Sequence, residues 1–424
     1  MMVVSKIFSI STFLIFFILL YAQDFVPHVH SSEKILSESG LSSSENALLE
    51  NCKYNISIFV YDLDPSLSNP FKNNGQEDMY STERRILNAM QMSNCRTWDP
   101  DNADFYFVPV APTEIAHEYL GKSGAELNAG FNFLDKVYQH IHQKFPFFNR
   151  SQGTDHIWAI SHDIGSCLAP PEILNGIFLQ HYGDKVHNKD CLLTYLNKSS
   201  TPPHPGLMER ASSPCYDPAK DIVVPPYTGN PREMVRWEFD ATASRPVLAH
   251  FRGGVRQERC YSNGIRQWLT SNLSAIHGFS VHTEHINQFA HRLETLKATF
   301  CLCPGGWVGW SQRAYQVMSA GCIPVFFEVQ GRTDHAFQNL LDYDRFAVRL
   351  RSTGELNSFD LQTILMSIES SGEAVQMKRN LQHNWKYFTY DNVHEAGDLD
   401  LPKGSFDLIL ISLHKKLIHR QKIR

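Results

Sequence analysis

Residues 300–327, FCLCPGGWVGWSQRAYQVMSAGCIPVFF, restrict the fold of this chain more than any other stretch. An apolar run ends at Pro304-Gly305-Gly306, residues that interrupt a strand. Ser311 is a suitable N-cap for the next segment, whose apolar residues recur at helical spacing. Residues 323–327 then suit a strand that is buried on both faces of a parallel sheet. The order strand, glycine loop, helix, strand predicts half of an α/β crossover.

Such a unit is a natural place for an anionic ligand. Ligands of open α/β sheets bind beyond the carboxyl ends of the strands, and a glycine loop before a helix N-terminus suits a pyrophosphate. Arg313 adds positive charge there, and Gln316, three residues later, shares its helix face. A structural strand-turn-helix with a surface arginine fits the same pattern, so the pattern alone leaves both interpretations open.

The segment resembles the exostosin-type glycosyltransferases, the GT47 family. That family has an F-x-L-C-P-x-G loop, then an arginine, an acidic residue three later, and G-C-I-P-V. This chain has FCLCPGG, Arg313 and GCIPV in that order, but Gln316 replaces the acidic residue. Three further motifs occur in the family's order: VYDLDP at 60–65, DIVVPP at 221–226 and LAHFRGGVR at 248–256. The resemblance covers about residues 55–390.

The chain has 424 residues, which favours two domains. Strands alternate with helices in two successive blocks, which predicts two α/β, Rossmann-like domains facing a cleft. The resemblance implies the GT-B architecture for the same pair. We expect a hydrophobic signal anchor or signal peptide at 1–22, a flexible lumenal stem at 23–51, an acceptor domain at 52–225 and a nucleotide-sugar-binding domain at 226–424.

Individual elements follow from periodicity and from turn residues. Expected strands lie near 56–61, 105–110, 157–160, 222–224, 247–251, 300–303, 323–327 and 346–350. Expected helices lie near 82–92, 126–142, 287–297, 312–320, 361–370 and 373–388. The Ser- and Pro-rich residues 198–220 should form a surface loop, and the basic residues 414–424 a solvated helix or tail.

The N-terminal segment indicates the secretory pathway. Lys6 precedes an uncharged run at 7–22, the charge order of a signal peptide or a signal anchor. The run is short for a membrane span, which needs about 20 residues, so cleavage and anchoring both remain open. The resemblance favours a type II Golgi membrane protein with a lumenal catalytic part. Cleavage would instead give a secreted protein.

Nine cysteines suit an oxidising compartment, where at most four disulfides could form and at least one thiol would stay unpaired. We expect Cys322, in an apolar turn, to be the buried free thiol. Cys301 and Cys303 lie two apart on one strand and should not pair with each other. Four glycosylation sequons agree with lumenal passage: Asn55, Asn149, Asn197 and Asn272.

Glycosyl transfer requires a leaving diphosphate to be stabilised, by a metal on an Asp-x-Asp pair or by arginines and backbone amides. Only Asp62-Leu63-Asp64, of four such triplets, follows a convincing strand, and Pro65 after it favours a turn. We therefore expect no metal and no other cofactor, with a UDP-sugar as the donor substrate. The expected donor site comprises Arg252, Arg256, Gly305, Gly306, Ser311, Arg313 and Gln316.

The second requirement is a base for the acceptor hydroxyl. His162 and Asp163 follow an expected strand and so should face the cleft, and either side chain can accept a proton. The pair resembles a His-Asp motif of plant-type members, although Ile164 replaces their tryptophan. A turn capped by Asp163 beside a packed His162 fits equally well. Glu114, after the expected strand 105–110, is the competing base.

The resemblance implies an inverting, metal-independent Golgi glycosyltransferase that moves a hexosyl, pentosyl or glucuronosyl group from a UDP-sugar to a polysaccharide or proteoglycan-type glycan. The alternative is a non-catalytic lumenal partner or glycan-binding subunit, which Gln316 supports. A hydrolase is disfavoured because no G-x-S-x-G motif is present. A net charge of −5 argues against nucleic acid as a partner. Membrane contact through an uncleaved N-terminus and a hetero-oligomer with another glycosyltransferase are left open.

Overall fold

The computed structural model describes residues 52–67, 78–118, 126–186, 188–197, 201–229, 239–328, 333–350, 358–390 and 404–423. All of them belong to one compact unit, Cys52–Arg424. The predicted hydrophobic segment 1–22 and stem 23–51 lie outside the described residues. Within the described ranges, no helix combines the length and the apolar character needed to cross a bilayer.

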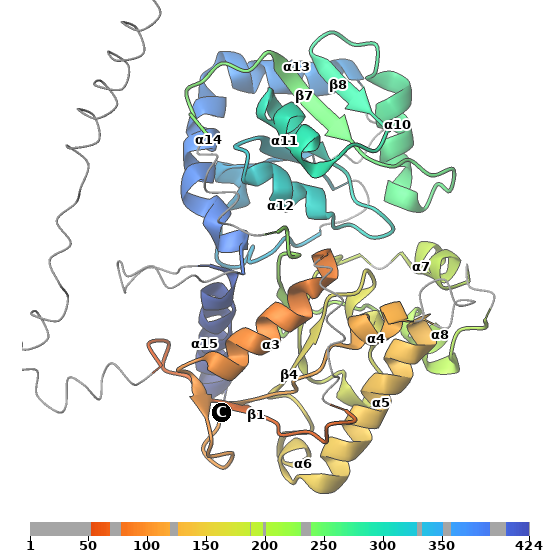
Figure 1. Ribbon diagram of the computed structural model, residues 1–424, viewed down its shortest axis with the longest axis vertical. Helices are drawn as coiled ribbons and strands as arrows, with labels where there is room; N and C mark the ends of the chain where they lie inside the picture. The colour runs from red at the N-terminus through yellow and green to blue at the C-terminus, as the bar shows by residue number, and fades with distance from the viewer. Residues whose placement is uncertain are drawn as a thin grey trace, which may run out of the picture. The chain divides into compact units, whose positions relative to one another are not determined.

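The first half of the chain forms a six-stranded sheet, called the N-lobe together with its helices (Figure 1). Every neighbouring pair is parallel, in the order β2-β1-β3-β4-β5-β6. The strands are β1 (Ile58–Val60), β2 (Arg96–Thr97), β3 (Phe105–Phe107), β4 (His156–Ile160), β5 (Ile177–Gln180) and β6 (Ile222–Val223). The helices are η1 (Met79–Ser81), α3 (Thr82–Met92), α4 (Pro112–Glu118), α5 (Glu126–Lys144), α6 (Phe147–Ser151), η2 (Gly165–Leu168), η3 (Pro171–Ile173), α7 (Lys189–Leu196) and α8 (Pro205–Arg210).

The second half forms the C-lobe, a five-stranded parallel sheet in the order β11-β10-β9-β7-β8. Its strands are β7 (Val247–Arg252), β8 (Phe279–His282), β9 (Ala298–Cys303), β10 (Ile323–Phe327) and β11 (Val348–Leu350). Its helices are η4 (Tyr261–Gly264), α10 (Ile265–Asn272), α11 (Gln288–Leu296), α12 (Gln312–Met318), η5 (Tyr343–Arg345), α13 (Ser358–Ser370), α14 (Glu373–Asn384) and η6 (Trp385–Phe388). The prediction of two parallel α/β domains is confirmed.

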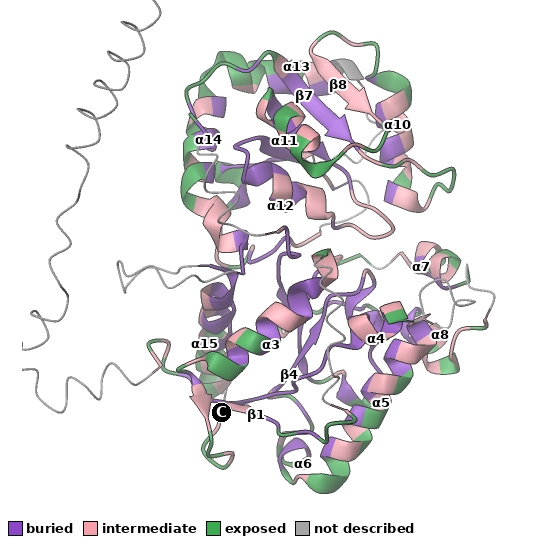
Figure 2. Ribbon diagram, viewed as in Figure 1, coloured by how far each residue is buried: buried purple, intermediate pink, exposed green. Residues whose placement is uncertain are grey.

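The apolar runs of the sequence are the buried central strands. All six residues of β9 and all five of β4 are buried, because each strand has a neighbour on both edges and helices over the sheet (Figure 2). The turn between α12 and β10 depends on Gly321, whose φ is 65°. A Cβ atom there would collide with the ring of Phe239, so only glycine fits.

The last helix, α15 (Ser405–Ile423), returns to the N-lobe. Lys416 Nζ donates to the Ala219 carbonyl at 3.0 Å, and the Arg420 guanidinium lies 4.4 Å from the Phe105 ring centre. Ile409 and Leu413 on the same helix are fully buried. By its contacts α15 belongs to the N-lobe, although its position in the chain falls within the predicted second domain. The basic C-terminal residues are thus a helix, as expected, but one with a packed face.

All nine cysteines lie in the described part, as four disulfides and one thiol. The pairs are Cys52–Cys95, Cys167–Cys215, Cys191–Cys260 and Cys301–Cys322. The prediction that Cys322 is the free thiol is wrong. Pro324, two residues after Cys322, is in register with Cys301 across β10 and β9. This register places the Cα atoms of Cys301 and Cys322 5.7 Å apart, a distance that suits a disulfide. Cys303 is the buried free thiol instead.

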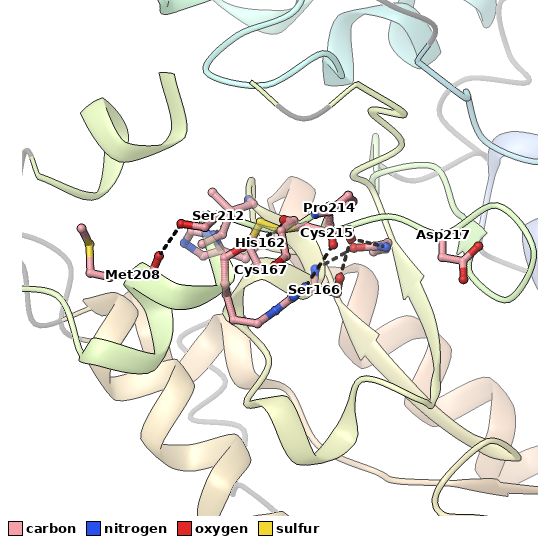
Figure 3. The surroundings of a disulfide bond; sticks show 12 residues. His162, Ser166, Cys167, Met208, Ser212, Pro214, Cys215 and Asp217 are labelled. Carbon is pink, nitrogen blue, oxygen red and sulfur yellow. Dashed lines mark hydrogen bonds between the residues drawn. A yellow bond between two sulfur atoms is a disulfide. The ribbon is translucent and has the colours of Figure 1, made fainter. Parts of the chain in front are cut away.

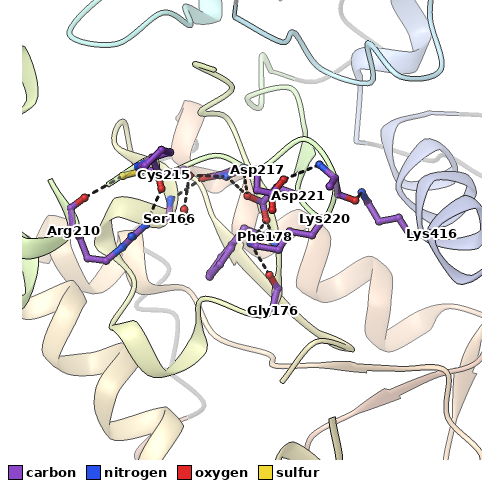
Figure 4. Close-up of polar contacts among 12 residues, drawn as sticks. Ser166, Gly176, Phe178, Arg210, Cys215, Asp217, Lys220, Asp221 and Lys416 are labelled. Carbon is purple, nitrogen blue, oxygen red and sulfur yellow. Dashed lines mark hydrogen bonds and ion pairs between the residues drawn. The ribbon is translucent and has the colours of Figure 1, made fainter. Parts of the chain in front are cut away.

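A buried carboxylate, Asp221, directly precedes β6 and binds β5 near its amino end. Asp221 accepts hydrogen bonds from the backbone amides of Phe178 and Asp217 and pairs with Lys220 at 2.7 Å (Figure 4). Gln180 extends this network to the backbone of Ser166 at 2.6 Å. The predicted surface loop is therefore held by Asp221 at one end. Its cysteine, Cys215, ties it to Cys167.

Direct contacts join the two lobes, and we call this set the inter-lobe clasp. Asp184, after β5, accepts hydrogen bonds from the Gly309 amide at 2.9 Å and from Thr333 Oγ1 at 2.7 Å. Asp334 accepts from Tyr216 Oη at 2.8 Å and pairs with Lys185 at 2.7 Å. A cavity of about 240 Å³ adjoins these residues. The Cys191–Cys260 disulfide adds a covalent link between the lobes.

Candidate active site

The topology of the C-lobe fixes where a ligand should bind. If the strands β7 to β11 are numbered 1 to 5 in chain order, they lie side by side in the sheet in the order 2-1-3-4-5. The direction in which the sheet grows therefore reverses between β7 and β9. Ligands of doubly wound sheets bind at this switch point, outside the carboxyl ends of the strands. Those ends carry Arg252-Gly253 and Pro304-Gly305-Gly306. The predicted glycine loop therefore lies at the expected crevice.

Arg313 points into this crevice from the first turn of α12. Its Nη1 donates to His291 Nε2 at 3.2 Å, and its guanidinium lies 5.1 Å from the Phe251 ring centre. A Cβ atom on Gly253 would come within 3.0 Å of Arg313 Nη2, so the glycine makes room for the cation. Among the described residues no carboxylate forms an ion pair with Arg313. Burial lowers its pKa to about 10, which leaves it charged at neutral pH.

Arg266 on α10, which the sequence analysis missed, shapes the loop beside Arg313. It donates to the carbonyls of Gly305 at 2.9 Å and Gly254 at 3.0 Å, and to Tyr261 Oη at 2.8 Å. It too forms no ion pair with a carboxylate of the described chain, and burial lowers its pKa. A single arginine in an amphipathic helix carries no sequence signal, because only the fold brings it to the loop.

The glycine loop is tightly folded. The Gly306 amide donates to the Val308 carbonyl at 3.0 Å, and a Cβ atom on Gly305 would lie 2.5 Å from that same oxygen. The Gly306 carbonyl accepts from the Ser262 amide. Gly305 is therefore required by the close approach of the backbone, whereas a Cβ atom on Gly306 would meet only the edge of the Tyr261 ring at 3.9 Å.

Two other expected donor-site residues have partners within the protein. Arg252 is held by both oxygens of Glu294, at 2.7 and 2.8 Å, and by the Glu284 carbonyl at 2.8 Å. Arg256 is exposed, and its guanidinium lies 5.4 Å from the Tyr261 ring and 5.5 Å from the Trp307 ring. Neither residue contacts Arg313 through a hydrogen bond in the described chain.

The helix that follows the loop carries the other two predicted residues. Ser311 precedes α12 with extended backbone angles, as an N-cap does, but its side chain makes no capping hydrogen bond. Gln316 is half-buried, and its side-chain amide makes no hydrogen bond with a described side chain or backbone group. Its side chain is thus available to a ligand one turn from Arg313.

His162 and Asp163 lie at the carboxyl end of β4, as predicted. His162 is 3% exposed and lies beside the Cys167–Cys215 disulfide (Figure 3). Its Nδ1 accepts from the Ile164 amide at 3.4 Å, and burial lowers its pKa to about 3. His162 is therefore a neutral, packed ring and a weak base.

Asp163 is half-buried, and its backbone contacts the segment that follows the glycine loop of the other lobe. Its carboxylate accepts from Tyr80 Oη at 2.9 Å, and its carbonyl accepts from Trp310 Nε1, four residues after Gly306, at 3.3 Å. Burial raises the pKa of Asp163, and the Tyr80 hydroxyl partly offsets that rise. Burial and then the charge of Asp163 also raise the pKa of Glu126, so the two carboxylates are neighbours.

The comparison with known families bears on this arrangement. A model of the exostosin GT47 domain matches residues 52–368, most of the chain. The chain belongs to the exostosin GT47 family.

Relatives in this GT47 family include plant enzymes. The chain is 28% identical over 308 residues to a probable glucuronoxylan glucuronosyltransferase, F8H, of Arabidopsis thaliana, covering 69% of this chain and 60% of that protein. It is 25% identical over 409 residues to a probable beta-1,4-xylosyltransferase, IRX10, of the same plant, covering 93% and 90%. The chain thus spans about three fifths of the first relative's length. Anabaena Alr3699/HepE in complex with UDP matches 87% of this chain and 100% of that chain, at 8% identity and a TM-score of 0.32, too slight a likeness to argue from.

The third predicted base in this GT47 chain, Glu114 on α4, is already paired. Its Oε1 lies 2.6 Å from Arg84 Nη2, and burial raises its pKa. Nearby Glu83, which the sequence analysis missed, is fully buried. It accepts hydrogen bonds from the amides of Thr113 at 3.1 Å and Ser161 at 2.7 Å. Glu83 therefore positions the strand end that carries Asp163.

The acidic triplet after β1 builds a turn. Asp64 accepts hydrogen bonds from the Ser66 amide at 2.9 Å and from Ser66 Oγ at 2.6 Å. In the described ranges, no three His, Cys, Asp or Glu side chains come together closely enough to hold a metal ion. That this GT47 protein needs no metal remains a prediction.

Proposed function

We propose that this GT47 protein is an inverting glycosyltransferase that moves a sugar from a UDP-sugar to a glycan and needs no metal ion. One observation carries the proposal. At the switch point of the C-lobe, Arg313 and Arg266 are two guanidinium groups without a carboxylate partner in the described chain. Burying a cation without a counter-ion is costly, so such a site favours an anionic ligand.

The chemistry assigned to these groups is a single displacement. An acceptor hydroxyl attacks the anomeric carbon from the side opposite UDP. The new C–O bond forms as the bond to the diphosphate oxygen breaks, and UDP leaves with that electron pair. Arg313 stabilises the charge that develops on the diphosphate, and the hydrogen bonds of Arg266 hold the glycine loop in place for it.

Asp163 is the base in this scheme. Its carboxylate takes the proton of the attacking hydroxyl, and its raised pKa makes it a better proton acceptor than an ordinary surface aspartate. Tyr80, which donates to Asp163 at 2.9 Å, holds the carboxylate in position. His162 and Glu114 fit the role less well because one is buried as a neutral ring and the other is paired with Arg84.

The names of the relatives support a glucuronosyl or xylosyl donor and a polysaccharide acceptor. The proposed location is the Golgi lumen, with a GT-B arrangement of the two lobes. Four disulfides suit an oxidising compartment, and the sequon residues are all exposed: Asn55, Asn149, Asn197 and Asn272.

A second function has its own support. Gln316 replaces an acidic residue of the family pattern, and the cation of Arg252 is engaged by Glu294 rather than free for a diphosphate. Both features suit a non-catalytic partner that retains the fold and a weakened donor site.

Calorimetric titration of the lumenal protein with UDP separates the two. We expect Arg313→Ala to weaken UDP binding by about tenfold to a hundredfold, as for a lost hydrogen bond to a charged group. Arg379→Ala, which removes an exposed arginine from α14 of the same lobe, should leave the affinity within about twofold.

Transfer assays with a panel of UDP-sugars complete the test. Transfer that persists in EDTA supports the metal-free mechanism, and transfer abolished by EDTA overturns it. UDP binding without transfer across the panel favours the non-catalytic partner. Failure of the unmodified protein to bind UDP would overturn the proposed donor site.

A further inference from the structure

We propose that Tyr195, Trp307 and Tyr261 form a platform on which a sugar ring of the acceptor glycan stacks. We call these three residues the aromatic platform. The assignment of this sugar to the acceptor, rather than to an unrelated glycan, rests on the proposed function.

The platform is compact and only half-buried. The Trp307 ring centre lies 5.6 Å from that of Tyr195 and 5.2 Å from that of Tyr261. All three side chains keep part of their surface in solvent. Arg256, exposed at the rim, lies about equally far from the Trp307 and Tyr261 rings, at 5.5 and 5.4 Å. Half-exposed aromatic groups with a few polar groups around them are the usual lining of an organic ligand site.

Both lobes contribute to the platform, and a disulfide joins the contributions. Tyr195 lies on α7 of the N-lobe, one turn after Cys191, and Tyr261 directly follows Cys260 in the C-lobe. Of the four disulfides, Cys191–Cys260 alone joins the two lobes. A small cavity of about 40 Å³ lies against Tyr195, Trp307 and this disulfide. The covalent link therefore joins the two segments whose tyrosines contact Trp307.

The platform lies between the proposed donor cations and the proposed base. On one side, Arg266 donates to Tyr261 Oη at 2.8 Å and to the carbonyl of Gly305, two residues before Trp307, at 2.9 Å. On the other side, the Asp163 carbonyl accepts a hydrogen bond from Trp310 Nε1, three residues after Trp307, at 3.3 Å. The charges of Asp163 and Glu126, after burial, also raise the pKa of the Tyr195 hydroxyl. Along the loop, Trp307 thus lies between the residue that contacts Arg266 and the residue that contacts Asp163.

The chemistry of this surface suits a saccharide. The flat faces of Trp and Tyr take up the apolar C–H side of a pyranose ring, and the carboxylates of Asp163 and Glu126 can accept hydrogen bonds from its hydroxyls. Arg256, which forms no ion pair with a described carboxylate, adds a cation for a uronate substituent. Uracil could also stack on Trp307, and the experiment separates that ligand from a sugar.

Two titrations of each variant test the platform, one with UDP and one with a set of saccharides. The saccharides are neutral β-1,4-xylohexaose and a hexasaccharide of the same length that contains glucuronate. We expect Trp307→Ala and Tyr195→Ala each to weaken saccharide binding by about tenfold or more, with UDP affinity within about twofold. Trp307→Phe should lose less than Trp307→Ala. Trp98→Ala, which removes a tryptophan that is 77% exposed in the N-lobe, is the matched control and should change neither affinity.

The outcomes are distinct. An unchanged saccharide affinity in Trp307→Ala overturns the platform, as does an unmodified protein that binds UDP but neither saccharide. Loss of UDP affinity in Trp307→Ala and in Tyr195→Ala assigns the surface to the nucleotide and also overturns the proposal. If the unmodified protein fails to bind UDP but binds a saccharide through Trp307, the platform stands and the proposed transferase function fails. Tyr195 lies in the other lobe, so a loss of saccharide binding in both Tyr195→Ala and Trp307→Ala could not come from a folding defect confined to the glycine loop.

Discussion

Arg313 and Gln316 share a face of α12, and their surroundings differ in a way that matters for nucleotide binding. Arg313 has a neutral partner, His291, whose pKa is lowered to about 4 by burial and by the arginine's own charge. The side-chain amide of Gln316 has no hydrogen-bond partner in the described chain. The cation is thus positioned by the protein, whereas the glutamine is left to the ligand.

Gln316→Glu should therefore tighten UDP binding. A carboxylate accepts a hydrogen bond from a ribose hydroxyl more strongly than an amide does, and the expected gain is about threefold to tenfold. Calorimetric titration measures it, with Gln376→Glu on exposed α14 as the matched control. An affinity no better than that of the unmodified protein would mean that Gln316 does not contact the nucleotide.

His162 predicts a specific acid lability. Its pKa is about 3 in the folded protein and about 6.5 when unfolded, so the neutral form is favoured by folding. The corresponding stability is fully present above pH 6.5 and is lost as pH falls from 6.5 toward 3. Between pH 7 and pH 4.5 the unmodified protein should lose on the order of 2 kcal/mol more than His162→Phe.

Urea unfolding at the two pH values measures this difference, because Asp163, Glu83 and His181 are present in both proteins and their contributions cancel. Parallel pH dependence in the two proteins would show that His162 is protonated in the folded state.

The sequence predicted which residues lie at the site better than it predicted which residues they contact. The glycine loop and Asp163 were found because each follows an apolar strand, and parallel strands end at one edge. Arg313 was found because it begins the helix that follows the loop. Arg252 satisfied the same rule, yet Glu294, 42 positions away, holds it. Arg266 and Tyr80 reach the site through tertiary contacts alone. No local pattern encodes such contacts.

At the scale of elements, long periodic segments were predicted to within a few residues. The predicted helix at 82–92 is α3, and that at 126–142 is α5 with two residues added. Strands β2, β5 and β8 were missed, and length alone does not explain this, because β6, with two residues, was predicted. Helix α12 ends at Met318, two residues early, because the turn at Gly321 begins there.

Helix α15 offers a test of element packing. Ile409→Ala or Leu413→Ala removes a fully buried side chain and should cost about 2 to 5 kcal/mol of unfolding free energy. Ile418→Ala, on the same helix at 37% exposure, should cost under about 1 kcal/mol. Urea midpoints compare the three. Equal small losses would indicate that α15 is not packed on the N-lobe in solution.

At the scale of the molecule, what the sequence could not reveal is how the lobes are joined. Nine cysteines allow many pairings, and spacing does not select one that crosses between domains. The inter-lobe clasp likewise joins residues more than a hundred positions apart, such as Tyr216 and Asp334. Strand order, by contrast, follows from local alternation and the handedness of crossovers, so the two sheets could be predicted separately.

The clasp predicts cooperative melting. In scanning calorimetry the unmodified protein should unfold in one transition, because partly buried hydrogen bonds and an ion pair connect the lobes. Asp184→Ala and Tyr216→Phe together remove the hydrogen bonds but leave the Lys185–Asp334 ion pair, and they should broaden or split that transition. Ser371→Ala, at an exposed position in the C-lobe, is the control. Two transitions in the unmodified protein would contradict this account.

The return of α15 to the N-lobe also bears on biosynthesis. Domains usually fold in the order in which they leave the ribosome. Here the C-lobe is inserted between β6 and α15, so the partners that Phe105 and Ala219 find on α15 are made after the C-lobe. The N-lobe is therefore completed after the C-lobe has emerged. Synthesis of α15, rather than of the first sheet, sets the earliest moment at which the first lobe can reach its native state.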